Sequence, residues 1–81
     1  MGVVFGPDGD LYVTSLVNDS VERYDGVTGA FISTFVSPDS GGLNGARNSV
    51  FGPDGNLYVS SRRTDEVLQY DGTTGEFIKA F

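Results

Sequence analysis

The stretch FGPDGNLYVS at residues 51–60 decides the fold, because the chain has already spelled FGPDGDLYVT at residues 5–14. Laying residues 3–35 over residues 49–81 without a gap gives 20 identities in 33 positions, so the 81-residue chain contains an internal duplication. The period of 46 residues lies in the range of propeller blades and of some helical repeats. The pattern inside the unit has to distinguish these two architectures.

Each copy contains four short runs rich in β-branched and aromatic residues, with turn residues between them and no apolar spacing of three and four. In the second copy these runs are 49–51, 56–61, 66–70 and 76–81. The Gly-Pro-Asp-Gly sequences place proline where a type I turn needs its fixed φ and glycine at the last position. The Asp-Gly-Val-Thr-Gly and Asp-Gly-Thr-Thr-Gly sequences supply the turn between the third and fourth runs. Each copy is therefore predicted to be a four-stranded antiparallel meander.

The predicted strands carry bulky apolar groups on both faces, as in Leu57-Tyr58-Val59. A sheet with two apolar faces must be covered on both sides, and radial stacking of such sheets is the propeller arrangement. The predicted fold class is all-β, with two four-stranded antiparallel propeller blades per chain that assemble into a ring. We assign blade 1 to residues 1–35, an inter-blade linker to residues 36–48, and blade 2 to residues 49–81.

The unit GPDGNLYVSS followed, after a gap, by VLQYDGTTGEFIKAF resembles a blade of the NHL-type β-propellers, a broad group that includes streptogramin lyases and gluconolactonases. The resemblance covers nearly all of both copies, and it implies the blade type and says almost nothing about function. Met1 stands directly before the inside of a repeat, at Gly2 and Val3, which suggests a truncated or engineered fragment of such a propeller.

The repeated aromatic residues are interpreted as scaffold that packs between blades, rather than as a stacking platform for bases or sugars. This set comprises Phe5, Tyr12, Tyr24, Phe31, Phe51, Tyr58, Tyr70 and Phe77. The repeated aspartates lie in glycine turns, where the side chain caps its own backbone, so turn formation outweighs catalysis as their role.

Chain direction predicts which loops share a face, because every strand reversal changes sides. Both kinds of repeated turn should lie on one face, and the loops between the second and third strands should lie on the other with the linker. The copies differ on this second face, so we expect any binding function there. Its candidate anion- or partner-binding residues are Arg47, Arg62 and Arg63, for which solvated surface charge is the preferred alternative.

The composition excludes several kinds of chemistry. The sequence has no cysteine and no histidine, which removes disulfides, thiolate metal sites and the Ser-His and Cys-His nucleophile arrangements. The net charge of -6 argues against a nucleic acid partner. No apolar run exceeds three residues, so no membrane span or signal peptide is predicted in this chain, and the compartment is undetermined.

Three function classes follow. The enzymes that the resemblance implies depend on a histidine and a metal, or on carboxylates around a divalent metal, and no acid occurs between Ser40 and Pro53. A lactonase- or lyase-type enzyme fragment is therefore the least favoured class, and we expect no catalytic, cofactor-binding or metal-binding residue. A ligand- or protein-binding module that uses the variable-loop face is the alternative. The preferred class is a non-catalytic building block that self-assembles head to tail, with six blades in a trimer preferred and eight blades in a tetramer next.

Overall fold

The structure, a computed structural model, describes residues 2–81 and is all-β. The first sheet contains β1 (Gly2–Phe5), β2 (Leu11–Ser15), β3 (Ser20–Tyr24) and β4 (Phe31–Val36), and the second contains β5 (Ala46–Phe51), β6 (Leu57–Ser61), β7 (Glu66–Tyr70) and β8 (Phe77–Ala80). Both sheets are antiparallel, with strands in chain order, which confirms the predicted pair of meanders. Two short 3-10 turns, η1 (Ser40–Gly42) and η2 (Arg62–Thr64), complete the described elements. Within residues 2–81 no helix is long and apolar enough to cross a membrane.

The Gly-Pro-Asp-Gly turns have the geometry that their sequence predicts. The Gly9 N–H donates to the Gly6 carbonyl at 3.0 Å, and Gly9 has a φ of +85°, which a residue with a side chain rarely adopts. The Asp8 carboxylate accepts the N–H of Asp10 at 3.0 Å. The second copy repeats this arrangement, including the turn hydrogen bond from Gly55 to Gly52 at 3.0 Å. The hairpins between the first and second strands are thus built by turn chemistry.

The turns between the third and fourth strands depend on an aspartate side chain. Asp25 Oδ1 accepts the backbone N–H groups of Val27 and Thr28 at 2.8 and 2.9 Å, and Asp71 does the same for the equivalent threonines. The N–H of Thr28, then that of Val27, stabilises the ionised carboxylate and lowers the pKa of Asp25. These aspartates therefore hold the turn, as the sequence predicts.

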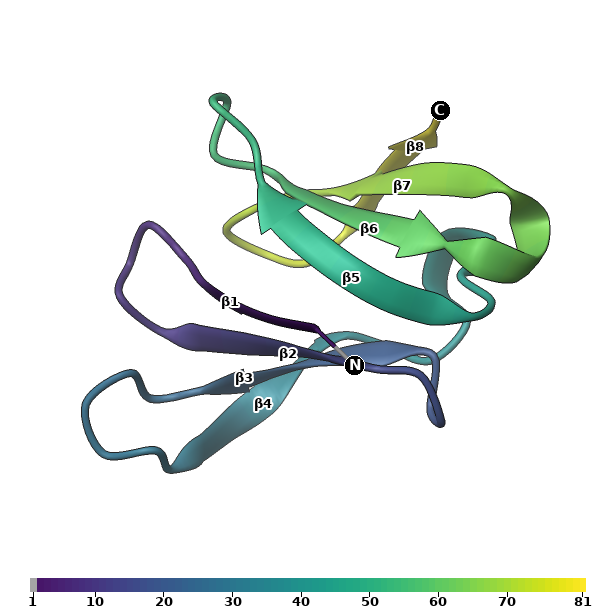
Figure 1. Cartoon of the computed structure of the whole chain (residues 1–81). Coiled ribbons are helices and arrows are strands. Elements are labelled where there is room, and N and C mark those ends of the chain that lie inside the picture. Colours follow the sequence, from purple (N-terminus) through teal and green to yellow (C-terminus); the bar gives the residue numbers. More distant parts are fainter. Residues whose placement is uncertain (1) are drawn as a thin grey trace.

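The four hairpin turns lie at one end of the molecule, and the β2–β3 loop, the β6–β7 loop and the connector between the sheets lie at the other (Figure 1). This arrangement confirms the faces that were predicted from chain direction. The strands reach into the predicted linker from both sides, since β4 ends at Val36 and β5 begins at Ala46. The prediction that the first strand of the second copy begins at residue 49 was wrong by three residues, because Ala46 still pairs with Ser61 across the sheet.

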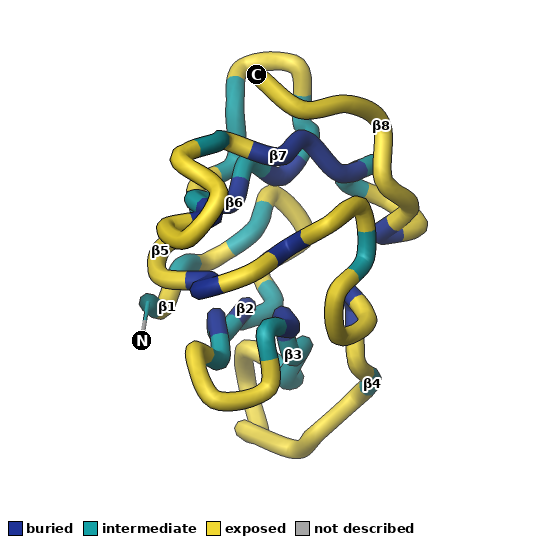
Figure 2. The backbone as a smooth tube through the Cα atoms, turned by 90° about the vertical axis from the view of Figure 1, so that its right-hand side faces the viewer, coloured by how far each residue is buried: buried dark blue, intermediate teal, exposed yellow. Residues whose placement is uncertain are grey.

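The two sheets are stacked, and β5 lies against β1 and β2 (Figure 1). The buried segments gather between the sheets, while the β3–β4 turn and β8 are exposed (Figure 2). The core members share near-complete burial and come from both sheets and the connector. They are Tyr12, Val21, Phe35, Val36, Leu43, Ala46, Leu57, Val59, Leu68 and Tyr70.

Candidate assembly surfaces

Equivalent strands of the two sheets bury opposite faces. In β2 the buried side chains are Tyr12 and Thr14, whereas in β6 they are Leu57, Val59 and Ser61. Because successive side chains of a strand point to opposite faces, the two sheets use different surfaces for the same contact. The sheets are stacked in the same orientation, so that the side of the first sheet that carries Tyr12 packs against the side of the second sheet that carries Leu57 and Val59.

We call the side of each sheet that carries Tyr12 or Tyr58 its front face. The opposite side is the back face, and an apolar row crosses it with its members directly opposite one another from strand to strand. In the second sheet the row is Phe51, Leu57, Tyr70 and Phe77, and in the first sheet it is Phe5, Leu11, Tyr24 and Phe31. The row of the second sheet faces the first sheet, whereas that of the first sheet points outward, leaving Phe5 64% and Phe31 58% exposed.

Tyr12 is the centre of the contact between the sheets. Its side chain is 1% exposed, and its ring packs edge-on against Phe35 of its own sheet and Phe51 of the next, with centroids 5.0 and 4.9 Å apart. Edge-to-face pairs at this distance contribute about 0.5–1.5 kcal/mol each beyond burial. Burial, then the hydrogen bond to the Asp8 carboxylate, raises the pKa of Tyr12 well above its ordinary value. The hydroxyl therefore stays protonated and acts as a hydrogen-bond donor.

The front face of the second sheet carries the same apolar groups, but none of residues 2–81 covers them. Val21 is 0% exposed and Phe35 is 8% exposed, whereas their equivalents Val67 and Phe81 are 42% and 60% exposed. Tyr58 is half-buried and has Phe81 as its aromatic neighbour, at 5.9 Å. A surface that is closed in one copy of the repeat is thus open in the other.

The contact between the sheets also includes a close backbone approach. A Cβ at Gly75 would lie 2.0 Å from the Phe35 carbonyl oxygen, so only glycine fits there. At the equivalent Gly29, which has a similar φ of +77°, a Cβ would meet no atom within 4 Å. Nearby, the Thr14 hydroxyl donates to Ser49 Oγ at 2.9 Å. These contacts fix how the second sheet is placed on the first.

The connector packs against the back row of the second sheet. The Tyr70 hydroxyl donates to the Ser40 carbonyl at 2.6 Å, and the Tyr70 ring lies 5.8 Å from that of Phe77. Burial raises the pKa of Tyr70 to about 12. Tyr24 and Phe31 form the same ring pair at 5.7 Å on the outward side of the first sheet.

The eight aromatic residues interpreted as blade-packing therefore fall into two groups. Tyr12, Phe51, Tyr70 and Phe77 lie where the sheets or the connector meet. Phe5, Tyr24, Phe31 and Tyr58 occupy the equivalent positions on the two outward faces.

Sequence reasoning missed a charged network on the front face of the first sheet. The Arg23 guanidinium donates to the Asp10 carboxylate at 2.7 and 3.0 Å and to that of Asp8 at 3.0 Å. Burial tends to raise the pKa of Asp8, but the N–H of Asp10, the Tyr12 hydroxyl and Arg23 outweigh it, and this pKa is lowered. The hydrogen bonds tie the first hairpin turn to β3.

The second sheet replaces this charged network with a neutral one. Asn56 stands in place of Asp10 and Gln69 in place of Arg23. Gln69 Nε2 donates to Asp54 Oδ2 at 3.2 Å and to the Tyr58 hydroxyl oxygen at 3.0 Å. The Tyr58 hydroxyl donates to Asp54 at 2.6 Å and is the main cause of the lowered pKa of this carboxyl. The signal for both networks was in the sequence, because the two copies differ at both positions together.

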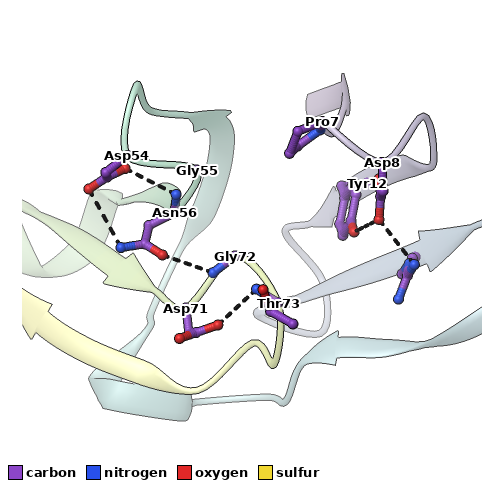
Figure 3. A pocket seen from close by; sticks show the side chains of 10 residues that line it. Pro7, Asp8, Tyr12, Asp54, Gly55, Asn56, Asp71, Gly72 and Thr73 are labelled. Atoms are coloured by element: carbon purple, nitrogen blue, oxygen red, sulfur yellow. Dashed lines mark hydrogen bonds and ion pairs between the residues drawn. The ribbon is translucent and has the colours of Figure 1, made fainter.

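A cavity of about 560 Å³ separates the two networks at the turn end of the molecule (Figure 3). Asp8, Tyr12 and Arg23 line one side, and Asp54 and Asp71 line the other. Each of these carboxylates already accepts hydrogen bonds from the chain, as Figure 3 shows for the turns. The network therefore holds the turns, and we assign no reaction to it.

The three candidate arginines do not converge on one point. Arg47 and Arg62 line a hollow of about 600 Å³ at the loop end of the second sheet, beside Asp65 and Glu66. Arg63 donates to the side-chain oxygen of Asn44 at 3.3 Å, away from that hollow. Within the part of the chain that the structure describes, Arg23 is the only arginine that forms an ion pair.

Among the described residues no group of three or more histidine, cysteine, aspartate or glutamate side chains is placed so as to hold a metal ion. No protein-family model matches the sequence, and a search of curated proteins found no match. The two outward faces, one on each sheet, are therefore the features of the molecule that bear most directly on its function.

Proposed function

We propose that this chain is a non-catalytic β-propeller building block that self-assembles head to tail into a closed ring. The observation that carries the proposal is the opposite burial in β2 and β6. The chain contains one front-to-back contact, and it leaves one front face and one back face open. The two copies share 20 of 33 residues, among them the aromatic residues and the glycine of the packed contact, so the open faces carry the main groups of the pair that is already packed.

The aromatic and glycine residues of the contact are the same in both copies, which supports this pairing, although Val3 in place of Ser49 leaves the Thr14–Ser49 hydrogen bond without an equivalent. Tyr58 would meet Phe5 of a second copy as Tyr12 meets Phe51, at a T-shaped ring contact of about the same distance. The Phe81 carbonyl of one copy would lie over Gly29 of the next, as the Phe35 carbonyl lies over Gly75. These predicted contacts use only residues whose equivalents are observed in contact.

The proposed contact joins two different surfaces, so it is heterologous. Such contacts close into a ring or continue without limit. Each chain contributes two sheets, which restricts a closed ring to an even number of blades. Propellers have about four to eight blades. We prefer six blades in a trimer, as in many propellers of the NHL type that the sequence resembles, and place eight blades in a tetramer second.

The mass of the particle in solution tests the proposal. Native mass spectrometry or light scattering should give three times the chain mass of 8.6 kDa for the trimer or four times for the tetramer. Phe5→Asp places a charge in the open back row and should produce monomers that remain folded by circular dichroism. Val17→Asp makes the same kind of change at an exposed loop residue outside both faces and should leave the mass unchanged. A parent chain that stays monomeric at micromolar concentration would refute self-assembly.

A further inference from the structure

The packed contact between the two sheets contains a polar link that the open contact cannot repeat. Asp19 Oδ1 accepts the backbone N–H groups of Gly45 and Ala46 at 2.7 and 3.2 Å, where the connector enters β5. At the repeat offset of 46 residues the equivalents of these two amides would precede residue 1, so residues 2–81 of a second copy offer none. Asp65 is the equivalent of Asp19 and repeats its left-handed φ, +55° against +53°, but it finds no such amides to cap.

A second polar link joins two hydroxyl groups. Thr14, on the front face of the first sheet, is 0% exposed, and its hydroxyl donates to Ser49 Oγ on the back face of the second sheet at 2.9 Å. At the open contact Ser60 is the equivalent of Thr14, and Val3 of a second copy is the equivalent of Ser49. Because a valine side chain neither donates nor accepts a hydrogen bond, this link is lost as well.

The hydroxyl of Ser60 is already satisfied within its own sheet. It accepts the Asn48 N–H at 3.1 Å and donates to the Asn48 carbonyl at 3.3 Å, on the neighbouring strand β5. The pairing of β5 with β6 is irregular between Ala46 and Ser49, which leaves the Asn48 backbone outside the regular ladder and free to bond with this hydroxyl. Ser60 therefore needs no polar partner from a second copy, in contrast to Thr14.

An apolar slot of about 190 Å³ lies beside this hydroxyl on the front face of the second sheet. Val50, Tyr58 and Val67 are among the residues that line it, and the two valines are 58% and 42% exposed. In the first sheet the equivalents of Tyr58 and Val67 are Tyr12 and Val21, which the second sheet covers to 1% and 0% exposure. The slot thus lies where the next sheet is missing.

We propose that the side chain of Val3 of a second copy fills this slot, so that the contact between chains is apolar where the contact within the chain is hydrogen-bonded. Val3 pairs with Val13, whose neighbours Tyr12 and Thr14 point to the front, and it therefore lies on the back face, 61% exposed. The inference rests on the head-to-tail assembly proposed above, and it names a residue that determines the specificity of that assembly.

The difference between Val3 and Ser49 distinguishes the correct pairing of sheets from a wrong one. If the back face of a first sheet packed on the front face of another first sheet, Val3 would bury the Thr14 hydroxyl without a hydrogen-bond partner, which is unfavourable. The Ser60 hydroxyl carries no such cost, because it stays bonded to Asn48. The open front face of the second sheet therefore selects the back face that carries valine.

Serine at residue 3 tests the inference against a matched control. Val3→Ser shortens the side chain and adds a hydroxyl in the slot, and Val17→Ser makes the same change at a loop residue that is 91% exposed and lies outside both faces. We expect Val3→Ser to raise the concentration of half-dissociation, measured by sedimentation velocity, at least tenfold, and Val17→Ser to leave it within twofold of the parent. Val67→Ser changes the opposite wall of the slot and should act like Val3→Ser, so it replaces that variant if circular dichroism shows that Val3→Ser does not fold.

A double variant tests the role of the hydroxyl pair. Val3→Ser with Ser60→Thr recreates at the open contact the pair that Ser49 and Thr14 form inside the chain. We expect this double variant to return to within threefold of the parent. Ser60→Thr alone should weaken the assembly, because its methyl group competes with Val3 for the slot.

Each outcome has a distinct meaning. An assembled parent whose half-dissociation concentration is unchanged by Val3→Ser and by Val67→Ser would refute the role of the slot and leave the ring proposal standing. A double variant as weak as Val3→Ser would refute the role of Ser60 in selecting its partner. A monomeric parent would refute the ring proposal and this inference together.

Discussion

The same substitution at the two equivalent tyrosines should have two different consequences. Tyr12→Ala removes a ring that is 1% exposed, packs edge-on against Phe35 and Phe51, and donates a hydrogen bond to Asp8. Truncation of such a buried aromatic costs about 3–5 kcal/mol. The total stability of a chain of this length is roughly 4–12 kcal/mol. Tyr12→Ala should therefore leave much of the chain unfolded at any protein concentration.

Tyr58→Ala should act on assembly instead of folding. Within the chain, Tyr58 is half-buried and has one aromatic neighbour, Phe81, at 5.9 Å. We expect the monomer to lose about 1 kcal/mol, in the ordinary range for a substitution away from a packed core. The assembly should dissociate, because Tyr58 would occupy the central place that Tyr12 occupies inside the chain.

Denaturant melts at several protein concentrations, combined with native mass spectrometry, separate these effects. The midpoint of the parent should rise with concentration, since unfolding is linked to dissociation, and that of Tyr58→Ala should not. Equal losses for the two variants at a concentration where the parent is monomeric would contradict the assignment of the faces. A Tyr58→Ala variant that keeps the mass of the parent would contradict the proposed contact.

Three further predictions concern backbone, charge and metal. Gly29→Ala and Gly9→Ala each add a methyl group at a left-handed φ, +77° and +85°, where a Cβ meets no atom within 4 Å. The two variants should therefore lower the folding stability of the monomer by a similar amount. Only Gly29→Ala should block assembly, as measured by native mass spectrometry. Gly29 is the equivalent of Gly75, which lies against the neighbouring sheet, whereas Gly9 is the equivalent of Gly55, where a Cβ would meet no atom within 4 Å. The pKa values of four turn aspartates are lowered in the fold, so their contribution to stability is present above about pH 4 and is lost as the pH falls below it. These are Asp8, Asp25, Asp54 and Asp71. Urea midpoints should therefore drop between pH 4 and pH 2.5, and a midpoint that rises over this range would be the contrary result. Treatment with EDTA should leave the melting temperature unchanged, and a fall of more than about 5 °C, roughly 1 kcal/mol for a domain of this size, would indicate a metal that the sequence does not predict.

The strands and turns could be predicted from the sequence because their causes are local. Proline and glycine fix the Gly-Pro-Asp-Gly hairpins, and chain direction then places every loop at one end or the other. The burial of each sheet could not be predicted in the same way. Tyr12 and Tyr58 have near-identical sequence neighbours, and only the position of each sheet in the stack decides which tyrosine is covered.

The charged network on the first sheet was predictable in principle but needed a comparison between the copies. Asp10 and Arg23 both change in the second copy, to Asn56 and Gln69, so the charges disappear together. The structure places the two side chains in contact, since the Arg23 guanidinium donates to the Asp10 carboxylate at 2.7 and 3.0 Å. The cap by Asp19 gave a weaker signal, because the preference of aspartate for left-handed backbone explains its repetition equally well.

The number of chains in the proposed ring depends on two rotations that need not be equal. One is the rotation between the two sheets of a chain, which the connector, the Asp19 cap and the Gly75 contact fix. The other is the rotation between chains, where no connector crosses the contact and the neutral Gln69–Asn56 pair replaces Arg23–Asp10. A trimer requires the two rotations to sum to about 120° and a tetramer requires about 90°, because a heterologous contact must return to its origin to close. The mass of the particle therefore measures this sum. Gln69→Arg with Asn56→Asp would give the open front face the same charged residues as the packed one, so this double variant tests whether the charge of the front face sets the number of blades.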